Sequence, residues 1–393
     1  MDPVGHHVSI IESALELEAI RELWQNEPCH PLADYEFFLT IAKVRASTSQ
    51  PLVLVLYRDE RAVSLLAGRI DYERRPIRLG YATLGTRSVR QVRFIAGGFL
   101  GETTSDAAAI FANEVGRFLR RRSLGVAVFE QLGADCVLQQ ALSARFGSIG
   151  QARTEGEARH WKLQLPTRWS DFMAARSSKH RYWLNRLARV LDADYPANWH
   201  IEVFSAPGST DRFLAAADAV ASKSYHRTLG VGFRRDEEFS ERVLLDAARG
   251  RLRGYVLLIE EQPCAFWYCI VYRGTLHLIA TAYDPGFQGY ELGTVLLMRV
   301  FRDHCGSEAT CVDFGLGDAV YKRRFGSTFA LEGPTYVFAQ SVRGLGLRCL
   351  YGCLQAVRAC ARAVLERAQL TQRLKTLWRR RLARHAAGRS PSP

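Results

Sequence analysis

One short sequence occurs twice in this chain, and it constrains the fold more than any other feature. Residues 144–148 read Ala-Arg-Phe-Gly-Ser, and residues 323–327 read Arg-Arg-Phe-Gly-Ser, so four residues are identical. Each copy follows a predicted helix that comes after a short apolar strand. An echo at the same place in two similar element orders indicates an internal duplication.

The predicted elements follow the same order around each copy. In the first half, apolar periodicity and turn residues predict helices at 15–24 and 34–46, a hairpin of strands at 52–57 and 62–70, a strand at 91–96, a helix from Ser105 to about 122, a strand at 126–130, a helix at 135–146 and a strand at 160–165. In the second half they predict a helix at 211–225, strands at 254–260, 264–272 and 275–283, a helix at 293–304, a strand at 310–314, a helix through Tyr321 and a strand at 335–340. Residues 166–200 connect the halves through a basic helix at 177–191.

Length and composition are those of a globular protein with more than one domain. The 393 residues are 48% hydrophobic and 24% charged. No basic segment followed by an apolar run opens the sequence, and no window approaches the roughly 20 apolar residues of a membrane span. The nine cysteines occur singly, without Cys-x-x-Cys spacing. We therefore expect a cytoplasmic protein with reduced thiols and no metal site.

The net charge of +13 is concentrated at the end of the chain. From Arg343 onward the sequence has twelve Lys and Arg residues and one acid, Glu366. The rest is nearly neutral, which argues against a nucleic-acid-binding face. In this basic tail, residues 343–393, apolar spacing predicts a helix over 347–364 that packs on the protein body. For residues 370–384 we expect peripheral contact with an anionic membrane surface.

A loop between a predicted strand and a predicted helix has the features of an anion site. Residues 283–294 end a strand, turn through Gln288 and Gly289, and begin a helix with Gly293 and Thr294. The free N–H groups and the dipole of a first helical turn favour a pyrophosphate. Gly293 would let the phosphates approach the backbone, and the Thr294 hydroxyl would add a donor. The alternative is that these small residues serve only packing and turn geometry.

The most specific motif lies at 313–326, where Asp313, Phe314 and Gly315 end a strand and the pair Tyr321-Lys322 follows. This segment resembles the GNAT-like acyltransferases related to the CelD proteins of cellulose biosynthesis. Residues 177–186 and 222–225 resemble the same family. The helix start, Glu-Leu-Gly at 291–293, departs from the family's Ser-Pro-Gly-like turn.

The resemblance implies direct transfer of an acyl group from acetyl-CoA, or another acyl-CoA, to a primary amine. Tyr321 would protonate the departing thiolate, and Asp313 would accept or orient the proton of the amine. Lys322, Lys179, Arg181 and Tyr225 would bind the acceptor or a CoA phosphate. From the residues alone, a helix core is favoured for Tyr321, a capped turn for Asp313 and a solvated face for Lys322.

The resemblance also implies the architecture. We expect α/β (α+β) tandem GNAT-type domains with mixed, mostly antiparallel sheets. Their bounds would be 1–165 for a non-catalytic copy and 166–342 for the catalytic one, followed by the tail. The acceptor would be a small-molecule or sugar amine, as in polysaccharide biosynthesis. Two alternatives stay open: a FemAB-like aminoacyltransferase that uses aminoacyl-tRNA, and a non-catalytic binding module.

Overall fold

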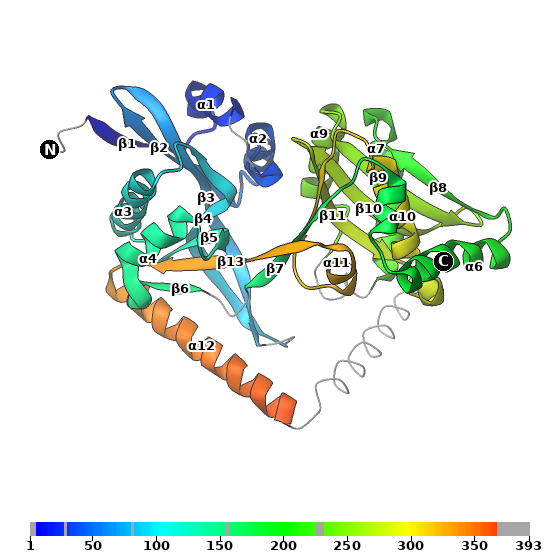
Figure 1. Cartoon of the computed structure of the whole chain (residues 1–393). Coiled ribbons are helices and arrows are strands. Elements are labelled where there is room, and N and C mark those ends of the chain that lie inside the picture. Colours follow the sequence, from blue (N-terminus) through cyan, green and yellow to red (C-terminus); the bar gives the residue numbers. More distant parts are fainter. Residues whose placement is uncertain (1–4, 27–29, 80–81, 154–156, 225–231, 368–393) are drawn as a thin grey trace, which may run out of the picture. The chain divides into compact units, whose positions relative to one another are not determined.

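The computed structural model describes residues 5–26, 30–79, 82–153, 157–224 and 232–367. These residues form two compact units (Figure 1). Unit 1 consists of Met1–Arg159 with Ala330–Ala368, and unit 2 is built on His160–Phe329. Residues 370–384, for which we predict the membrane contact, and Tyr225 lie outside the described residues. Within the described residues, no helix has both the length and the apolar character needed to cross a membrane.

Unit 1 has a mixed sheet with the strand order β1-β2-β3-β4-β5-β13, and β6 also pairs with β13. Only β4 and β5 run parallel to each other. Its elements are β1 (His6–Ile11), α1 (Arg21–Asn26), α2 (Tyr35–Val44), β2 (Ser49–Arg58), β3 (Arg61–Leu79), β4 (Ala82–Gly101), α3 (Ser105–Arg121), β5 (Val126–Gly133), α4 (Val137–Gly150), β6 (Gln151–Arg153), β13 (Thr328–Phe338) and α12 (Val342–Arg367), with short 3-10 helices η1 (Glu16–Ile20) and η2 (Pro31–Ala33).

Unit 2 repeats this plan with the strand order β7-β12-β11-β10-β9-β8. Here β11 and β12 are the parallel pair. Its elements are β7 (Ala158–Gln164), α5 (Trp169–Ala174), α6 (Ser178–Asp194), β8 (Trp199–Phe204), α7 (Thr210–Lys223), α9 (Glu237–Ala248), β9 (Leu252–Ile259), β10 (Gln262–Tyr272), β11 (Thr275–Tyr283), α10 (Leu292–His304), β12 (Cys311–Leu316) and α11 (Val320–Phe325), with 3-10 helices η3 (Pro207–Ser209) and η4 (Pro285–Tyr290).

Each sheet is completed by a strand from the opposite half of the sequence. β13 pairs antiparallel with β5 in unit 1, and β7 pairs antiparallel with β12 in unit 2. The expected bounds of 1–165 and 166–342 assigned these two strands the other way round. Apolar alternation identifies a strand but does not determine its partner, so the exchange is invisible to a local reading of the sequence.

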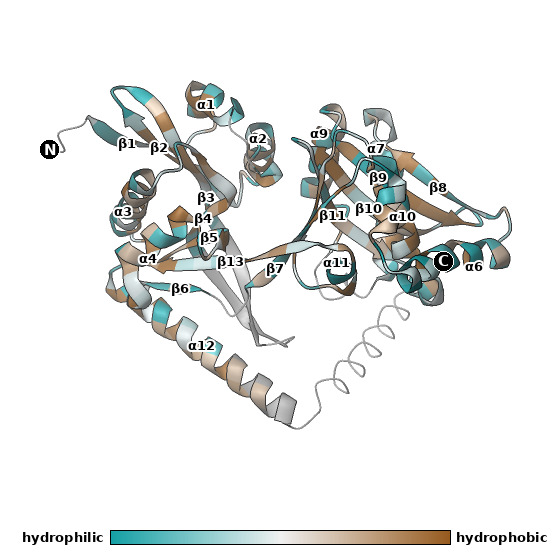
Figure 2. Ribbon diagram, in the orientation of Figure 1, coloured by the Kyte–Doolittle hydropathy of each residue, from teal (hydrophilic) through white to brown (hydrophobic). Residues whose placement is uncertain are grey.

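Apolar side chains of the sheet and of the helices packed against it form each core, and brown residues occur along both sheets in Figure 2. In unit 1, Phe111 and Val115 of α3 are fully buried one helical turn apart. In unit 2, Leu296 and Val300 of α10 are likewise fully buried one helical turn apart. This spacing of four residues places one face of each helix on its sheet.

Several local expectations differ from the structure. The residue that caps α3 is Thr104, whose hydroxyl accepts a hydrogen bond from Ala107 N at 3.2 Å, and not Ser105. The strands β1 and β8 and the helix α9 were not predicted from the sequence. α12 forms, and Leu347 of the predicted helix packs on the body, whereas Leu350 and Val357, which we expect to pack there too, are exposed.

Candidate active site

The sheet of unit 2 opens between its two parallel strands. β11 and β12 pair only from Thr275↔Cys311 to His277↔Asp313. Beyond this point β11 continues to Tyr283 and β12 to Leu316 without pairing with each other. The backbone polar groups of β11 that face the opening therefore receive no partner from β12. An elongated substrate that reaches this opening would find a row of hydrogen-bonding groups.

A β-bulge lies in β11 directly after the opening begins. Its pairing with β10 shifts between Tyr268↔Ala280 and Cys269↔Leu278, which leaves Ile279 as the extra residue. A bulge bends a strand and increases its local twist. The bend in β11 therefore accompanies its divergence from β12.

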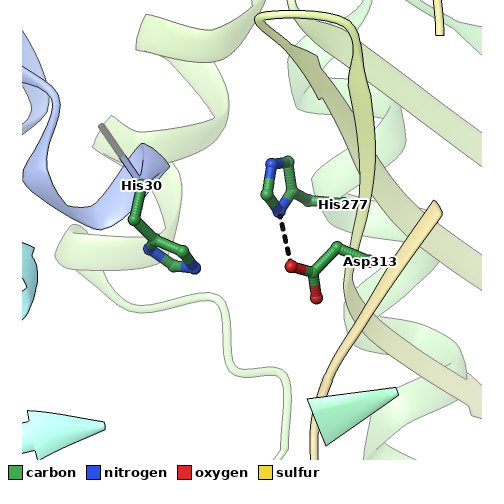
Figure 3. Close-up of side chains that lie close together, drawn as sticks. All are labelled: His30, His277 and Asp313. Atoms are coloured by element: carbon green, nitrogen blue, oxygen red, sulfur yellow. Dashed lines mark ion pairs between the residues drawn. The ribbon is translucent and has the colours of Figure 1, made fainter. Parts of the chain in front are cut away.

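The last paired residues, His277 and Asp313, form the floor of the opening. Asp313 accepts a hydrogen bond from His160 Nε2 at 2.6 Å and from Gly315 N at 2.7 Å. Its other carboxylate oxygen lies 3.7 Å from His277 Nδ1, and the two side chains point toward each other in Figure 3. All three side chains are buried. Burial by itself would raise the pKa of Asp313, but the hydrogen bond from His160 and the charges of His160 and His277 hold it well below its ordinary value.

These contacts favour a positioning role for Asp313 over the expected role as proton acceptor. A carboxylate whose pKa is strongly lowered is a weak base, and both of its oxygens already face other groups. Asp313 instead connects three strands, since His160 comes from β7 and His277 from β11.

The turn that follows Asp313 is held by Lys322. Its Nζ donates to the carbonyl oxygens of Gly315 at 3.0 Å and Leu316 at 2.7 Å. Gly315 and Gly317 have φ values of +66° and +112°, a region that favours glycine. Burial lowers the pKa of Lys322 to about 8, an effect that the charge of Asp313 opposes. The buried ammonium therefore stabilises this turn, which differs from the expectation that it faces an anion.

Tyr321 lies next to this turn, in α11. Its ring contacts Trp267 edge-to-face at 5.4 Å between centroids and Phe314 at 6.2 Å. No hydrogen bond to its hydroxyl is present among the residues that the structure describes. Burial raises the pKa of this phenol well above its ordinary value, as does the neighbouring Cys269. Tyr321 is therefore a phenol packed against two aromatic rings and protonated at neutral pH.

The predicted anion site lies at the start of α10. Asp284 caps the loop by accepting from Gly286 N at 2.9 Å. A Cβ on Gly289 would have no neighbour within 4 Å, and one on Gly293 would approach only the Tyr283 ring at 4.0 Å. No side chain caps α10, because its N-cap residue Glu291 has left-handed backbone angles. Thr294 N already donates to Glu291 O at 2.7 Å, so the N–H groups of Leu292 and Gly293 are the ones that can bind an anion.

Three side chains surround this helix start. Thr294 Oγ1 donates to the Glu291 carboxylate at 3.4 Å, and Arg324 donates to the same oxygen at 3.4 Å. The Thr294 hydroxyl is thus already engaged, and Arg324 balances the negative charge of Glu291 beside the helix start. Gln288 is exposed, and its carbonyl accepts a hydrogen bond from Glu291 N.

The other two predicted acceptor-binding residues with described positions lie on α6. Lys179 is exposed, whereas Arg181 is half-buried and donates to the backbone carbonyl of Arg176. Ser177 caps α6, since its hydroxyl accepts a hydrogen bond from His180 N at 3.3 Å, which agrees with the predicted helix start. Tyr290 of η4 donates to Asp194, the last residue of α6, at 2.8 Å. One end of α6 is thereby held to the loop before α10.

Sequence reasoning missed His160, His277 and Trp267. The contact of His160 with Asp313 spans 153 residues of sequence and depends on the strand exchange. Trp267 Nε1 donates to Gly293 O at 3.1 Å and its ring contacts Tyr321, so it connects the helix start to the phenol. No local pattern distinguishes these residues from ordinary strand residues.

Comparisons with known proteins agree with this geometry. Residues 178–323 match the family model described as an acetyltransferase (GNAT) domain. A search of curated proteins returns no significant match. Among solved structures, FemX is similar with a TM-score of 0.56 and 10% identity, covering 87% of this chain and 99% of that one. A tandem GNAT protein from the clavulanic acid biosynthesis pathway has a TM-score of 0.50 and 9% identity, covering 85% and 99%.

Residues 178–323 of unit 2 are therefore similar to a GNAT acetyltransferase domain. At 9–10% identity, the solved structures establish only the fold. The predicted mixed α/β fold of tandem GNAT type is confirmed. The narrower resemblance to CelD-related proteins stays a prediction.

Proposed function

We propose that unit 2 transfers an acyl group, most simply acetyl, from CoA to a primary amine of a small molecule or sugar. This proposal rests mainly on the opening between β11 and β12. It offers unpaired strand groups to the arm of a thioester, while the uncapped start of α10 offers N–H groups to the pyrophosphate. Gly289 and Gly293 leave room for phosphates to approach the backbone.

The reaction requires one proton donor, and we assign this role to Tyr321. The neutral amine attacks the thioester carbonyl carbon, whose oxygen is polarised by a backbone N–H of β11. The C–S bond then breaks, and the departing thiolate takes the proton of the Tyr321 hydroxyl. The amine gives its proton to water and the phenolate is reprotonated from solvent, so the products are an amide and free CoA. Because its pKa is raised, this phenol carries its proton at neutral pH.

The buried residues around Tyr321 position this donor. Trp267 and Phe314 fix its ring. Lys322 and Asp313 fix the glycine turn that leads into α11. We assign Asp313, His160 and His277 this positioning role and give them no proton-transfer step.

A titration with acetyl-CoA tests the proposal. A ligand at a hundred times its dissociation constant stabilises a protein by roughly 2.7 kcal/mol, which a thermal melt detects. Release of the CoA thiol in the presence of a panel of amines then measures transfer. No stabilisation by acetyl-CoA, or stabilisation without thiol release from any amine, would argue against acyl-CoA transfer and for a binding module.

The similarity to FemX is a reason to test aminoacyl-tRNA as an alternative acyl donor. The fold likeness and the exposed basic residue Lys179 of α6 also suit an aminoacyl-tRNA. Aminoacyl transfer from charged tRNA in the same assay, without a response to acetyl-CoA, would favour that alternative.

A further inference from the structure

α12, Val342–Arg367, carries an apolar face that the described part of the protein leaves uncovered. The exposed fraction is 92% for Val342, 54% for Leu345, 43% for Leu350 and 48% for Val357. Cys349, Cys353 and Cys360 are also exposed. We call the exposed side chains between Val342 and Val357 the outward face of α12. In Figure 2 much of this helix is coloured brown or pale.

The opposite face of the helix packs on unit 1. Leu347 and Tyr351 contact a cluster of Val126, Val128 and Phe338. The only charged residues between positions 342 and 357 are Arg343 and Arg348.

These two arginines turn toward the protein. Arg343 donates to Ser123 O at 3.1 Å, and Arg348 donates to Ser148 O at 3.4 Å. The outward face of α12 therefore has no charge over its described length. Contiguous exposed apolar surface of this kind marks a contact with a protein or a membrane.

Charge decides between these partners. The segment from Arg343 to the end of the chain has twelve basic residues against Glu366, and it carries most of the net charge of +13. A second copy docked on the same face would bring two strongly positive segments together, which is unfavourable. An anionic lipid surface would attract them, at about 1 kcal/mol per basic residue near the surface.

We propose that the outward face of α12 lies on an anionic membrane surface. Its apolar side chains enter the boundary between headgroups and acyl chains, and the positive charge of the sequence that follows favours anionic lipid over neutral lipid. Unit 1 would thereby hold the protein at the membrane, a role separate from the acyl transfer proposed for unit 2.

Substitution of the face tests the proposal. The variant Leu345→Glu/Val357→Glu places two acids on it. Leu15→Glu/Ile149→Glu is the matched control, because these two residues of unit 1 are also exposed. Binding of the full chain is measured by flotation with vesicles of phosphatidylglycerol and phosphatidylcholine. We expect the face variant to partition about a hundredfold less than the wild type and the control to lose far less. Equal losses in the two variants, or no loss in the face variant, would overturn the proposal.

The exposed cysteines provide a second readout on the unmodified protein. Cys349 and Cys353 should react with a water-soluble maleimide in solution and become protected when anionic vesicles are added. Vesicles of phosphatidylcholine alone should protect them little. Unchanged reactivity with bound anionic vesicles would place the contact elsewhere. Protection without lipid, together with a dimer that the face variant dissociates, would identify a second copy as the occupant and overturn the proposal.

Discussion

The two units share one plan but differ at the point where their parallel strands separate. In unit 1 the last paired residues are Phe94 of β4 and Phe129 of β5, whose rings stack at 4.6 Å. In unit 2 the equivalent residues are His277 and Asp313. Two stacked phenylalanine rings therefore occupy this position in unit 1, whereas buried polar side chains occupy it in unit 2.

The helix that follows the opening also differs between the two units. α3 of unit 1 is capped by the hydroxyl of Thr104 and has Asp106 as its second residue. α10 of unit 2 has no side-chain cap and has Gly293 at the equivalent place. The sequence echo also aligns Tyr321 with Leu142, which is fully buried. In unit 1 a threonine side chain caps the helix start, and a buried leucine stands at the position of the tyrosine. In unit 2 the N-cap residue makes no side-chain capping bond, so the helix start can bind an anion, and Tyr321 can donate a proton. The comparison supports our proposal that only unit 2 is catalytic.

Gly293→Glu should have the largest effect on acetyl-CoA binding. It places an acid in α10 at the position that Asp106 occupies in α3 of unit 1. The carboxylate would occupy the phosphate position, and an added Cβ there meets only the Tyr283 ring, at an ordinary contact distance of 4.0 Å, so the fold should persist. We expect no acetyl-CoA binding by calorimetry at about a thousand times the wild-type dissociation constant. Asp106→Asn is the control and should bind normally. Normal affinity in Gly293→Glu would place the phosphate site elsewhere.

Phe129→Ala should destabilise the protein without affecting catalysis. Removal of a fully buried ring that stacks on Phe94 should lower the free energy of unfolding by about 4 kcal/mol. Urea unfolding measures this change, and an assay at a temperature where the variant is folded should give wild-type turnover. A drop in turnover of the folded variant would mean that unit 1 contributes to the reaction.

Asp313→Asn should lower stability in a pH-dependent way. Breaking a buried ionic cluster costs about 3 kcal/mol. The pKa of Asp313 is lowered in the folded protein, so its stabilisation is present above the unfolded pKa of about 4 and is lost as the pH falls toward the folded value. The difference in unfolding free energy between wild type and variant should therefore shrink below about pH 4. A difference that is constant with pH would contradict the assigned charge state.

Tyr321→Phe should lower turnover by roughly a hundredfold, since it removes the general acid and keeps the ring. The affinity for CoA should change little, because the phenol has no role in holding the cofactor. Tyr336→Phe, which alters a half-buried phenol of unit 1, is the control. Wild-type turnover in Tyr321→Phe with a competent amine would remove this residue from the mechanism.

Thr104→Ala should have the smallest effect. Loss of the cap of α3 should cost about 1 kcal/mol of stability, measured by urea unfolding. Acetyl-CoA affinity should stay unchanged if only the helix start of unit 2 binds phosphate. A gain or loss of affinity would show that unit 1 also contacts the ligand.

The sequence by itself determined the duplicated α/β plan, most helices and strands, and the positions of Gly293 and Tyr321. These depend on periodicity, turn residues and short motifs, which act over a few residues and are therefore visible locally. It also located the basic charge at the end of the chain, although it placed Leu350 and Val357 on the packed side of the helix.

Only the tertiary structure decided the exchange of β7 and β13, and with it the contact of His160 with Asp313. It also decided that Lys322 is buried in the turn of Gly315 and that Asp313 is held by two histidines. Strand pairing and burial depend on residues far apart in the sequence. A carboxylate or an ammonium therefore acquires its role from neighbours that no local pattern specifies.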